Sequence, residues 1–422
     1  MRKVIVIGGG IVGLACARRL QMQGAQVTVI DSAPTPDKRC SYGNAGGIAV
    51  SEIAPASIPG IGWKVPGWLL DPLGPLSIRW RHVIRLAPWI RAFIHAGQAD
   101  QIRPIASALA SLNALVYEDL VPLLADLGLS GDLHRLGAIV VYSSAAALES
   151  DSWEWQLRSH LGIPWQRLTP AELTDLEPNL SSTFQIGVLL PSWSHVANPQ
   201  RIVARLGERL VEQGGQLLAG EVRNFELASG QARSAITSDQ RRFDADCIVV
   251  AAGAWSSALA RILGDRVLLE SERGYNTTLS APGIRMSREL IFAEGKFVVT
   301  PLEAGLRVGG AAEFAGLIAP PNFKRAEALL NIAKRALPGL ATGKGTVWMG
   351  HRPATPDSLP VIGASRRAAN VYYAFGHGHL GLTQAASTAR LVAELCSGRT
   401  PSIDLAPFSP GRFLHQPQWR EQ

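Results

Sequence analysis

The sequence predicts an α/β protein in which a Rossmann-like nucleotide-binding domain, discontinuous in the chain, is joined to a second α+β domain rich in antiparallel sheet. Three observations predict this fold class. A G-x-G-x-x-G turn stands between a strand and a helix at the start of the chain, and a second glycine turn precedes a helix near its end. Between them, short apolar runs separated by turn residues are typical of antiparallel strands.

The N-terminal segment has the order of a nucleotide-binding unit. A β-branched run predicts a buried parallel strand over 3–7, helical spacing predicts a helix over 11–23, and a second strand follows over 26–30. The glycines after the first strand have separate tasks. Gly8 permits the tight turn, Gly10 lets a pyrophosphate approach the backbone, and Gly13 lets helix and strand pack closely.

Asp31 ends the second strand, where its carboxylate can accept hydrogen bonds from ribose hydroxyls and would repel the 2′-phosphate of NADP. Together with Ile11, Val12 and Ser32, the glycines and this acid are predicted to hold the ADP half of a dinucleotide. A secretory signal peptide would also explain a basic, apolar start. A signal peptide does not require this ordered spacing of strand, glycine turn, helix, second strand and acid, so we reject that alternative.

Two further segments carry glycine turns. In CIVVAAGAWS, residues 247–256, a buried strand runs into Ala252, Gly253 and Trp255, where a ligand can come close. Near the C-terminus, a strand over 371–375 leads through Gly376, Gly378 and Gly381 into a helix that begins at about 382 and ends at Gly398. A helix N-terminus of this kind is a second place where negative charge is stabilised.

One ligand held by glycine turns at both ends of the chain implies that these ends share a domain and that the middle is inserted. We therefore assign 1–54, 196–265 and 346–422 to the nucleotide-binding domain, and 55–195 and 266–345 to the second, substrate domain. In the first domain we also expect a helix over 200–214 and a strand over 216–225. In the second we expect short antiparallel strands over 153–191 and 273–313, with a hairpin over 296–314.

Composition and charge narrow the class of protein. The chain has 422 residues, and we find no uninterrupted apolar run long enough to cross a bilayer. Its four cysteines lie far apart, which argues against a disulfide framework or a zinc site and suits a reducing compartment. The histidines lack the spacing of metal ligands, so no metal is expected. The net charge of +7 comes from bases scattered among acids, and nucleic acid is not an expected partner.

One stretch, SIRWRHVIRLAPWIRAFIHAGQ at 77–98, departs from this charge pattern. It lies in a span without Asp or Glu, and its arginines alternate with Trp80, Trp89 and Phe93. A basic helix with aromatic residues can lie on an anionic bilayer surface. The alternative, which we favour, is a pair of helices broken at Pro88 whose apolar side packs inside the protein.

Several motifs, in this order, resemble those of the FAD-dependent D-amino acid oxidase superfamily, and within it the bacterial D-amino acid dehydrogenases. Besides G-x-G-x-x-G and IVVAAGAWS they are SYGNAGG at 41–47, RGYNTTL at 273–279, GHRPATPDSLPVIG at 350–363 and GHGHLGLT at 376–383. The resemblance spans nearly the whole chain. It implies that the discontinuous domain binds FAD.

The resemblance also implies roles for individual residues. Asn44, Ala45 and Gly46 would lie beside the isoalloxazine ring, and Val222 would contact the adenine side through its backbone. Arg352 would bind the substrate carboxylate with Tyr275 as its neighbour. Backbone N–H groups at the pyrimidine end of the flavin would come from the C-terminal glycine turn and helix start, namely Gly378, His379, Leu380, Gly381, Leu382 and Thr383.

The residue types suit the oxidation of an amine next to a carboxylate. The planar fork of an arginine makes two parallel bonds to a carboxylate, and a tyrosine can add a third. Alternatives remain for each residue: Arg352 could pair with Asp357 in a turn-like loop, and Tyr275 could simply pack within a strand. His377 and His379 could shuttle protons, although the backbone alone explains the glycines around them.

The function expected from the resemblance is oxidation of the Cα–N bond of a D-amino acid, or of a D-proline-like secondary amine, by hydride transfer to flavin N5. The imine would hydrolyse to a 2-oxo acid, and electrons would pass to a quinone or carrier. The alternatives are an FAD-dependent oxidase of glycine- or sarcosine-like amines and a non-catalytic FAD-binding subunit of a larger complex. We expect a cytoplasmic location and leave open peripheral contact with the inner membrane and an oligomeric state.

Overall fold

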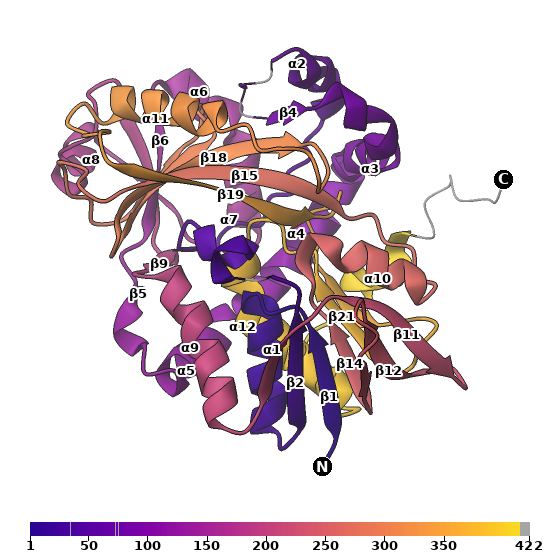
Figure 1. The fold of residues 1–422 in the computed structure, drawn as a ribbon. Coiled ribbons are helices and arrows are strands. Elements are labelled where there is room, and N and C mark those ends of the chain that lie inside the picture. Colours follow the sequence, from indigo (N-terminus) through magenta and orange to yellow (C-terminus); the bar gives the residue numbers. More distant parts are fainter. Residues whose placement is uncertain (34, 72, 75, 414–422) are drawn as a thin grey trace.

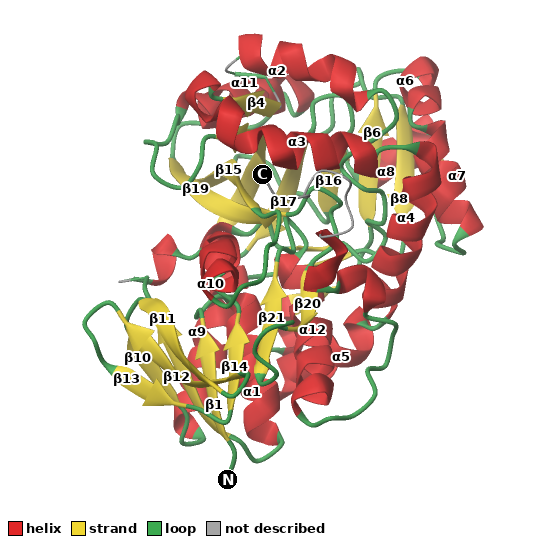
Figure 2. Ribbon diagram, turned by 90° about the vertical axis from the view of Figure 1, so that its right-hand side faces the viewer, coloured by secondary structure: helices red, strands yellow, loops and turns green. Residues whose placement is uncertain are grey.

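A computed structural model describes residues 1–413 apart from 34, 72 and 75. Figure 1 shows two main layers of sheet, a six-stranded sheet in the lower half and a nine-stranded sheet in the upper half. Four helices, α1, α12, α5 and α9, lie around the lower sheet, and α11 covers one face of the upper one (Figures 1 and 2). The α/β fold class predicted from the sequence is confirmed.

The six-stranded sheet has the order β10-β2-β1-β14-β21-β20, and all of its pairs are parallel except β20·β21. Its strands come from both ends of the chain and from the middle: β1 (Lys3–Ile7), β2 (Gln26–Asp31), β10 (Gln216–Ala219), β14 (Cys247–Val250), β20 (Val361–Ala364) and β21 (Val371–Phe375). The sheet is therefore assembled from segments far apart in the sequence, as the two glycine turns predict.

Successive side chains of β1 point to opposite faces of this sheet, and other elements pack on both faces. Val4 and Val6 pack with α1 (Ile11–Met22), α9 (Pro199–Glu212) and α12 (Gly381–Cys396). Ile5 and Ile7 point to the other face, toward α10 (Ser256–Ile262) and a small sheet of β11 (Val222–Ala228), β12 (Gln231–Thr237) and β13 (Arg242–Asp244). A strand buried on both faces reads as a continuous apolar run, which is how KVIVI reads.

The nine-stranded sheet has the order β19-β15-β18-β17-β16-β6-β8-β7, with β4 paired to the end of β18. Its pairs are antiparallel except β16·β6 and β18·β4. The strands are β4 (Leu76–Ile78), β6 (Ala138–Tyr142), β7 (Gln166–Leu168), β8 (Ile186–Leu190), β15 (Glu270–Leu279), β16 (Glu289–Phe292), β17 (Phe297–Leu302), β18 (Gly305–Phe314) and β19 (Gly345–Ala354). The predicted hairpin is β17–β18, in which Leu302 pairs with Gly305.

In the described part of the chain, the remaining elements are eight α-helices and a small sheet. The helices are α2 (Val65–Leu70), α3 (Val83–Ala96), α4 (Ala99–Ala114), α5 (Val116–Asp126), α6 (Ala145–Ser150), α7 (Ser152–His160), α8 (Pro170–Leu176) and α11 (Lys324–Ala336). A second small sheet joins β3 (Gly47–Ile48), β9 (Ser194–Val196) and β5 (Leu133–His134). The domain boundaries stated above stay a prediction. The strand β19 lies in the large sheet, and its last residue, Ala354, bridges to His377 beyond β21.

Three local predictions were wrong. The strand expected over 216–225 is two strands in different sheets, because the chain turns at Gly220, whose N–H donates to the Asp31 carbonyl. Residues 152–160 form α7 rather than a strand, and Trp155 of this helix is buried. Pro88 lies inside the single helix α3. The carbonyl that Pro88 leaves without an N–H partner belongs to Ile84, which is 88% exposed, so water can satisfy it.

The helices α4 and α5 follow each other over Ala99–Asp126, and by length and composition this 28-residue segment could cross a membrane. Its polar groups show how it packs in the protein. Asn113 accepts a hydrogen bond from Gln384, and Asp119 accepts one from Arg390, both residues of α12. The segment therefore packs against α12, a helix that covers one face of the six-stranded sheet.

Candidate active site

The N-terminal glycine turn leaves open space at one of its three glycines. A Cβ on Gly8 would lie 2.3 Å from the Ala251 carbonyl oxygen, and one on Gly13 would lie 2.0 Å from the Gly8 carbonyl oxygen. At Gly10, by contrast, a Cβ would meet only Ser41 Oγ, at 3.4 Å. Gly8 and Gly13 are thus needed for packing. Gly10 leaves room for a phosphate in front of α1, and the adjacent Ile11 N–H already donates to Ser41 Oγ at 3.0 Å.

Asp31 lies at the carboxyl end of β2, beside this turn. Its carboxylate accepts hydrogen bonds from the backbone N–H groups of Gly9 and Ala33 and from Arg39 Nε, the last at 3.3 Å. Ser32 follows and is exposed, and Val222 begins β11 close by, two residues after Gly220. The residues predicted for the adenosine side therefore lie together. Arg39, which no sequence pattern marks as part of the site, lies with its positive charge against Asp31.

The loop that carries Asn44, Ala45 and Gly46 is held from two sides. From the large sheet, Asn276 Nδ2 donates to the Gly43 carbonyl at 2.7 Å, and Arg307 donates to the Asn44 carbonyl. From α12, Thr383 Oγ1 accepts the N–H of Ala49 at 3.0 Å. This loop lies where the nucleotide sheet, α12 and the large sheet meet, and Gly46 adopts the left-handed conformation there, with φ of 95°.

Trp348 of β19 fixes the same loop by packing between two glycines. A Cβ on Gly43 would lie 2.1 Å from the indole ring, and one on Gly350 would lie 1.9 Å from it. The indole N–H also donates to the Asp37 carbonyl at 3.1 Å. Only glycine at both positions leaves space for the ring in this orientation.

Arg352 lies on the same face of β19, four residues after Trp348. Its Nη1 is 2.6 Å from Glu272 Oε1 on β15, and its guanidinium covers Gly274, where a Cβ would lie 2.5 Å from Arg352 Cζ. The alternative partner, Asp357, pairs instead with Arg412 at 2.7 Å. After Arg352, the Pro353 carbonyl accepts the Gly378 N–H at 2.8 Å, which connects this strand to the C-terminal glycine turn.

Tyr275 is not brought to Arg352, and this part of the prediction was wrong. In the β15·β19 register Arg352 faces Glu272, whereas Tyr275 faces Met349, and side chains three residues apart on one strand point to opposite faces. The Tyr275 side chain is buried between the sheet and α11, and its hydroxyl donates to Glu313 at 2.5 Å. Glu272, which the sequence analysis did not single out, is the residue beside Arg352.

A cavity of about 120 Å³ lies between this strand pair and the C-terminal glycine turn. Glu272 and Glu52 supply carboxylates to its lining, and the turn contributes His379, which is exposed, and Leu380. Most of the remaining wall is apolar, with Leu86, Trp89, Ile90, Phe93 and Phe314 among the lining side chains. A small amphiphilic molecule with a polar head and an apolar tail suits such a lining.

Three buried titratable groups near the site, His377, His351 and Glu289, are neutral at pH 7. Burial lowers the pKa of His377 to about 3, and its Nε2 lies 2.9 Å from Thr388 Oγ1 of α12. Burial also lowers the pKa of His351 to about 4, and this ring packs against Trp255. Glu289 contacts Gly47 from the large sheet, and its burial raises its pKa to about 8. A proton-shuttling role for His377 has no support in this geometry.

The residues present fit a bound dinucleotide with a ring system at its far end. Ala252 and Gly253 follow β14, Gly253 with a φ of 55°, and Leu382 and Thr383 start α12 with backbone N–H groups unpaired within the helix. On β15, Asn276 Oδ1 is buried and has no hydrogen-bond partner among the described residues. A buried acceptor without a partner beside the Asn44 loop is the type of atom that a ligand donor satisfies.

Comparisons with known proteins agree with this geometry. A family model described as FAD dependent oxidoreductase, DAO, matches residues 3–395. A D-amino-acid oxidase of Bradyrhizobium diazoefficiens is 36% identical over 422 residues, 98% of this chain and 99% of its own length. A D-amino acid dehydrogenase of Sinorhizobium medicae is 30% identical over 97% of this chain and 100% of its own. The solved structure of a glycine oxidase from Geobacillus kaustophilus superimposes with a TM-score of 0.74 at 21% identity, covering 98% and 99% of the two chains.

Proposed function

We propose that this chain, which belongs to the DAO family of FAD-dependent oxidoreductases, oxidises the Cα–N bond of a D-amino acid. The family makes it an FAD-dependent enzyme. Relatives at 36% and 30% identity over nearly the whole chain are named for D-amino acids, which supports that substrate class. The structural likeness to glycine oxidase, at 21% identity, supports the fold alone.

The observation that carries the proposal is the Arg352–Glu272 pair beside the C-terminal glycine turn. Arginine binds a carboxylate through two parallel N–H···O bonds. Glu272 takes one N–H group of Arg352 and so orients the guanidinium, while the packing on Gly274 fixes its plane. A substrate carboxylate bound to the remaining N–H groups would orient the amino acid with its side chain in the apolar cavity.

When bound, FAD would supply the redox chemistry as the hydride acceptor. Arg352 would hold the substrate carboxylate and so fix the direction of the Cα–H bond, and positioning of this kind accounts for much of the acceleration in such reactions. The unpaired N–H groups at the start of α12 favour negative charge next to them. His377 stays neutral and holds the turn through Thr388. The imine product leaves and hydrolyses in water to a 2-oxo acid and ammonia.

We propose a quinone or a carrier protein as the electron acceptor, and a cytoplasmic location with peripheral contact to the inner membrane. The relatives named dehydrogenase support an acceptor other than oxygen, whereas the relative named oxidase favours oxygen as the second candidate. Reoxidation rates of the reduced protein with oxygen and with a soluble quinone distinguish the two acceptors.

The test is anaerobic reduction of the purified, FAD-loaded protein by a panel of D- and L-amino acids, imino acids and glycine derivatives. We expect bleaching of the flavin absorbance by D-amino acids with apolar side chains and no bleaching by their L-enantiomers. Bleaching by glycine and sarcosine alone would overturn the substrate class in favour of the glycine-type alternative. A flavin that no amine in the panel reduces would support the non-catalytic subunit instead.

A further inference from the structure

Three of the four cysteines lie together inside the protein, although the sequence places them far apart. Cys16 lies in α1, Cys247 begins β14, and Cys396 is the last residue of α12. All three are buried in the apolar cluster that includes α1, α9 and α12 on one face of the six-stranded sheet. The sulfurs of Cys247 and Cys396 are 3.2 Å apart, and we call these two residues the thiol pair.

The thiol pair needs little movement to become a disulfide. The sulfurs of a disulfide are about 2.05 Å apart, so those of Cys247 and Cys396 have to approach each other by only about 1 Å. The two side chains come from different elements that already pack through the same cluster. An approach of this size is within the range of side-chain rotation, so the strand and the helix can keep their places.

The pair lies close to the surface, at the end of α12. The residues that follow Cys396, from Ser397 to Thr400, are exposed. The guanidinium of Arg2, which is exposed as well, donates to the Cys396 carbonyl, and the Tyr372 side chain packs against the same cluster. The ends of helices open locally at little cost in free energy, so a small uncharged oxidant reaches the pair without global unfolding.

The groups around Cys396 determine how fast its thiol reacts. The Cys247 thiol beside it raises the pKa of Cys396, and burial does the same, whereas the positive charge of Arg2 opposes both. Because the thiolate is the form that attacks an oxidant, the closed protein reacts slowly, and the pair persists as thiols in a reducing compartment. Arg2 favours the thiolate once the helix end opens.

We propose that the thiol pair is a site of oxidative modification, at which a peroxide joins Cys247 and Cys396 in a disulfide. The thiolate of Cys396 attacks one oxygen of hydrogen peroxide, the O–O bond breaks, and a sulfenic acid and water form. The Cys247 thiol then attacks that sulfur, the S–O bond breaks, and the oxygen leaves as a second water. The two thiols together lose two electrons, which reduce one peroxide to two waters.

The disulfide stabilises the part of the protein that carries the proposed cofactor site. It closes a loop between residues 149 positions apart, and a cross-link restricts the unfolded chain more when the loop is long. It also joins the end of α12 to the start of β14, two elements whose other ends lead to that site, at Gly381 and toward Gly253. The proposal uses no property of the substrate and does not depend on the reaction proposed above.

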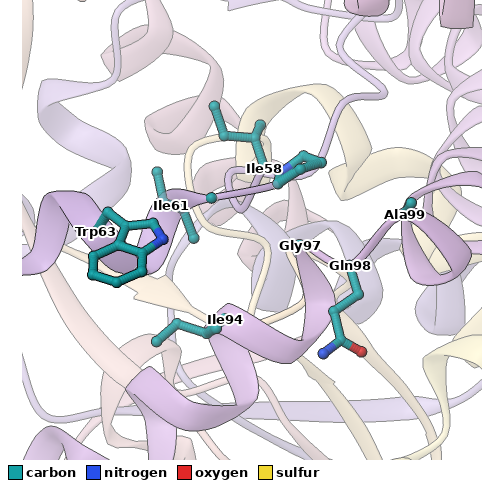
Figure 3. A pocket seen from close by; sticks show the side chains of 10 residues that line it. Ile58, Ile61, Trp63, Ile94, Gly97, Gln98 and Ala99 are labelled. Atoms are coloured by element: carbon teal, nitrogen blue, oxygen red, sulfur yellow. The ribbon is translucent and has the colours of Figure 1, made fainter.

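The test is treatment of the FAD-loaded full chain with excess hydrogen peroxide, then alkylation of free thiols in denaturant and peptide mass spectrometry without reductant. We expect a cross-linked peptide that joins Cys247 to Cys396 and that dithiothreitol releases. Oxidation elsewhere differs in mass, because the exposed side chains of Met22 and Trp63 gain oxygen, whereas a disulfide loses two hydrogens. Figure 3 shows Trp63 at an open apolar hollow, where an oxidant has free access.

Unfolding in urea measures the effect on stability, with release of flavin as the signal. The oxidised wild type should release flavin at a urea concentration about 0.5 M or more above that of the reduced protein. The variant Cys396→Ser should show neither the cross-link nor the shift, and Cys247→Ala replaces it if the serine prevents flavin binding. The matched control Cys16→Ala removes the third cysteine of the cluster and should keep both.

Three outcomes would overturn the proposal. They are sulfoxide at Met22 without a cross-link between Cys247 and Cys396, a cross-link that joins Cys16 instead, and a cross-linked protein that releases flavin at the same urea concentration as the reduced one. A chain that oxidises no amine can still form this disulfide, and an active enzyme can lack it. Either proposal can therefore fail without the other.

Discussion

Replacing Arg352 by alanine tests the centre of the proposed site. A hydrogen bond to a charged group contributes about 1.5–3 kcal/mol, and a substrate carboxylate would lose two of them. Because the Arg352 side chain is 24% exposed and its partner Glu272 is 22% exposed, solvent weakens the interaction. We therefore take the low end, about 3 kcal/mol, which corresponds to a fall of about 10²-fold in kcat/KM.

The difficulty is that Arg352→Ala also leaves Glu272 without its partner and destabilises the fold. The double variant Arg352→Ala/Glu272→Gln removes that unpaired charge, so it should recover stability in urea unfolding while kcat/KM stays low. Arg412→Ala is the matched control, because it breaks another partly buried ion pair, to Asp357 at 2.7 Å, outside the cavity.

The assay is steady-state oxidation of a D-amino acid with a dye as electron acceptor, at equal flavin content. If Arg352→Ala retains the wild-type kcat/KM, Arg352 does not bind the substrate. An equal loss in Arg412→Ala would mean that the effect arises from stability alone.

Three further substitutions test the space for the cofactor at Gly10, the packing of Arg352 on Gly274 and the buried acid Glu289. Gly10→Val should fold yet lose bound flavin, because its side chain enters the space left for the pyrophosphate, and retained flavin absorbance would contradict this assignment. Gly274→Ala should keep its flavin but lower kcat/KM by about tenfold or more, because the methyl group displaces the guanidinium, and unchanged kinetics would refute the packing. The pKa of Glu289 is about 8 in the folded protein, against an ordinary value of 4.5, so this carboxyl ionises more readily in the unfolded chain. Between about pH 5 and pH 8, the free energy of unfolding of the wild type should therefore fall relative to that of Glu289→Gln. The expected slope is about 1.4 kcal/mol for each pH unit. Urea unfolding at several pH values measures the difference, and parallel curves for the two proteins would show that Glu289 does not titrate there.

The sequence predicted those strands and helices that are marked by residues next to them in the chain. The strands over 3–7 and 371–375 have the predicted bounds, and α1 and α12 begin and end within a residue or two of the glycines that mark them. In each case a short apolar run, a glycine turn and a helical repeat adjoin each other in the sequence, so no distant segment is needed to recognise them.

What the sequence could not supply was register between distant strands. Glu272 and Arg352 face each other across 80 residues of chain, and only the β15·β19 pairing brings them together. The same register turns Tyr275 to the opposite face, although the family motif contains it. Arg39 is missed for a similar reason: its contact with Asp31 depends on the path of the chain between them, and no periodicity marks that path.

The indole of Trp348, packed between Gly43 and Gly350, has a consequence for any attempt to evolve this enzyme. Substitutions at positions 43, 348 and 350 are coupled, because a side chain larger than hydrogen at either glycine is compatible only with a residue smaller than tryptophan at 348. Libraries that randomise the loop at 40–46 while keeping the tryptophan would discard most of their members for steric reasons alone. Randomising the three codons together would recover them.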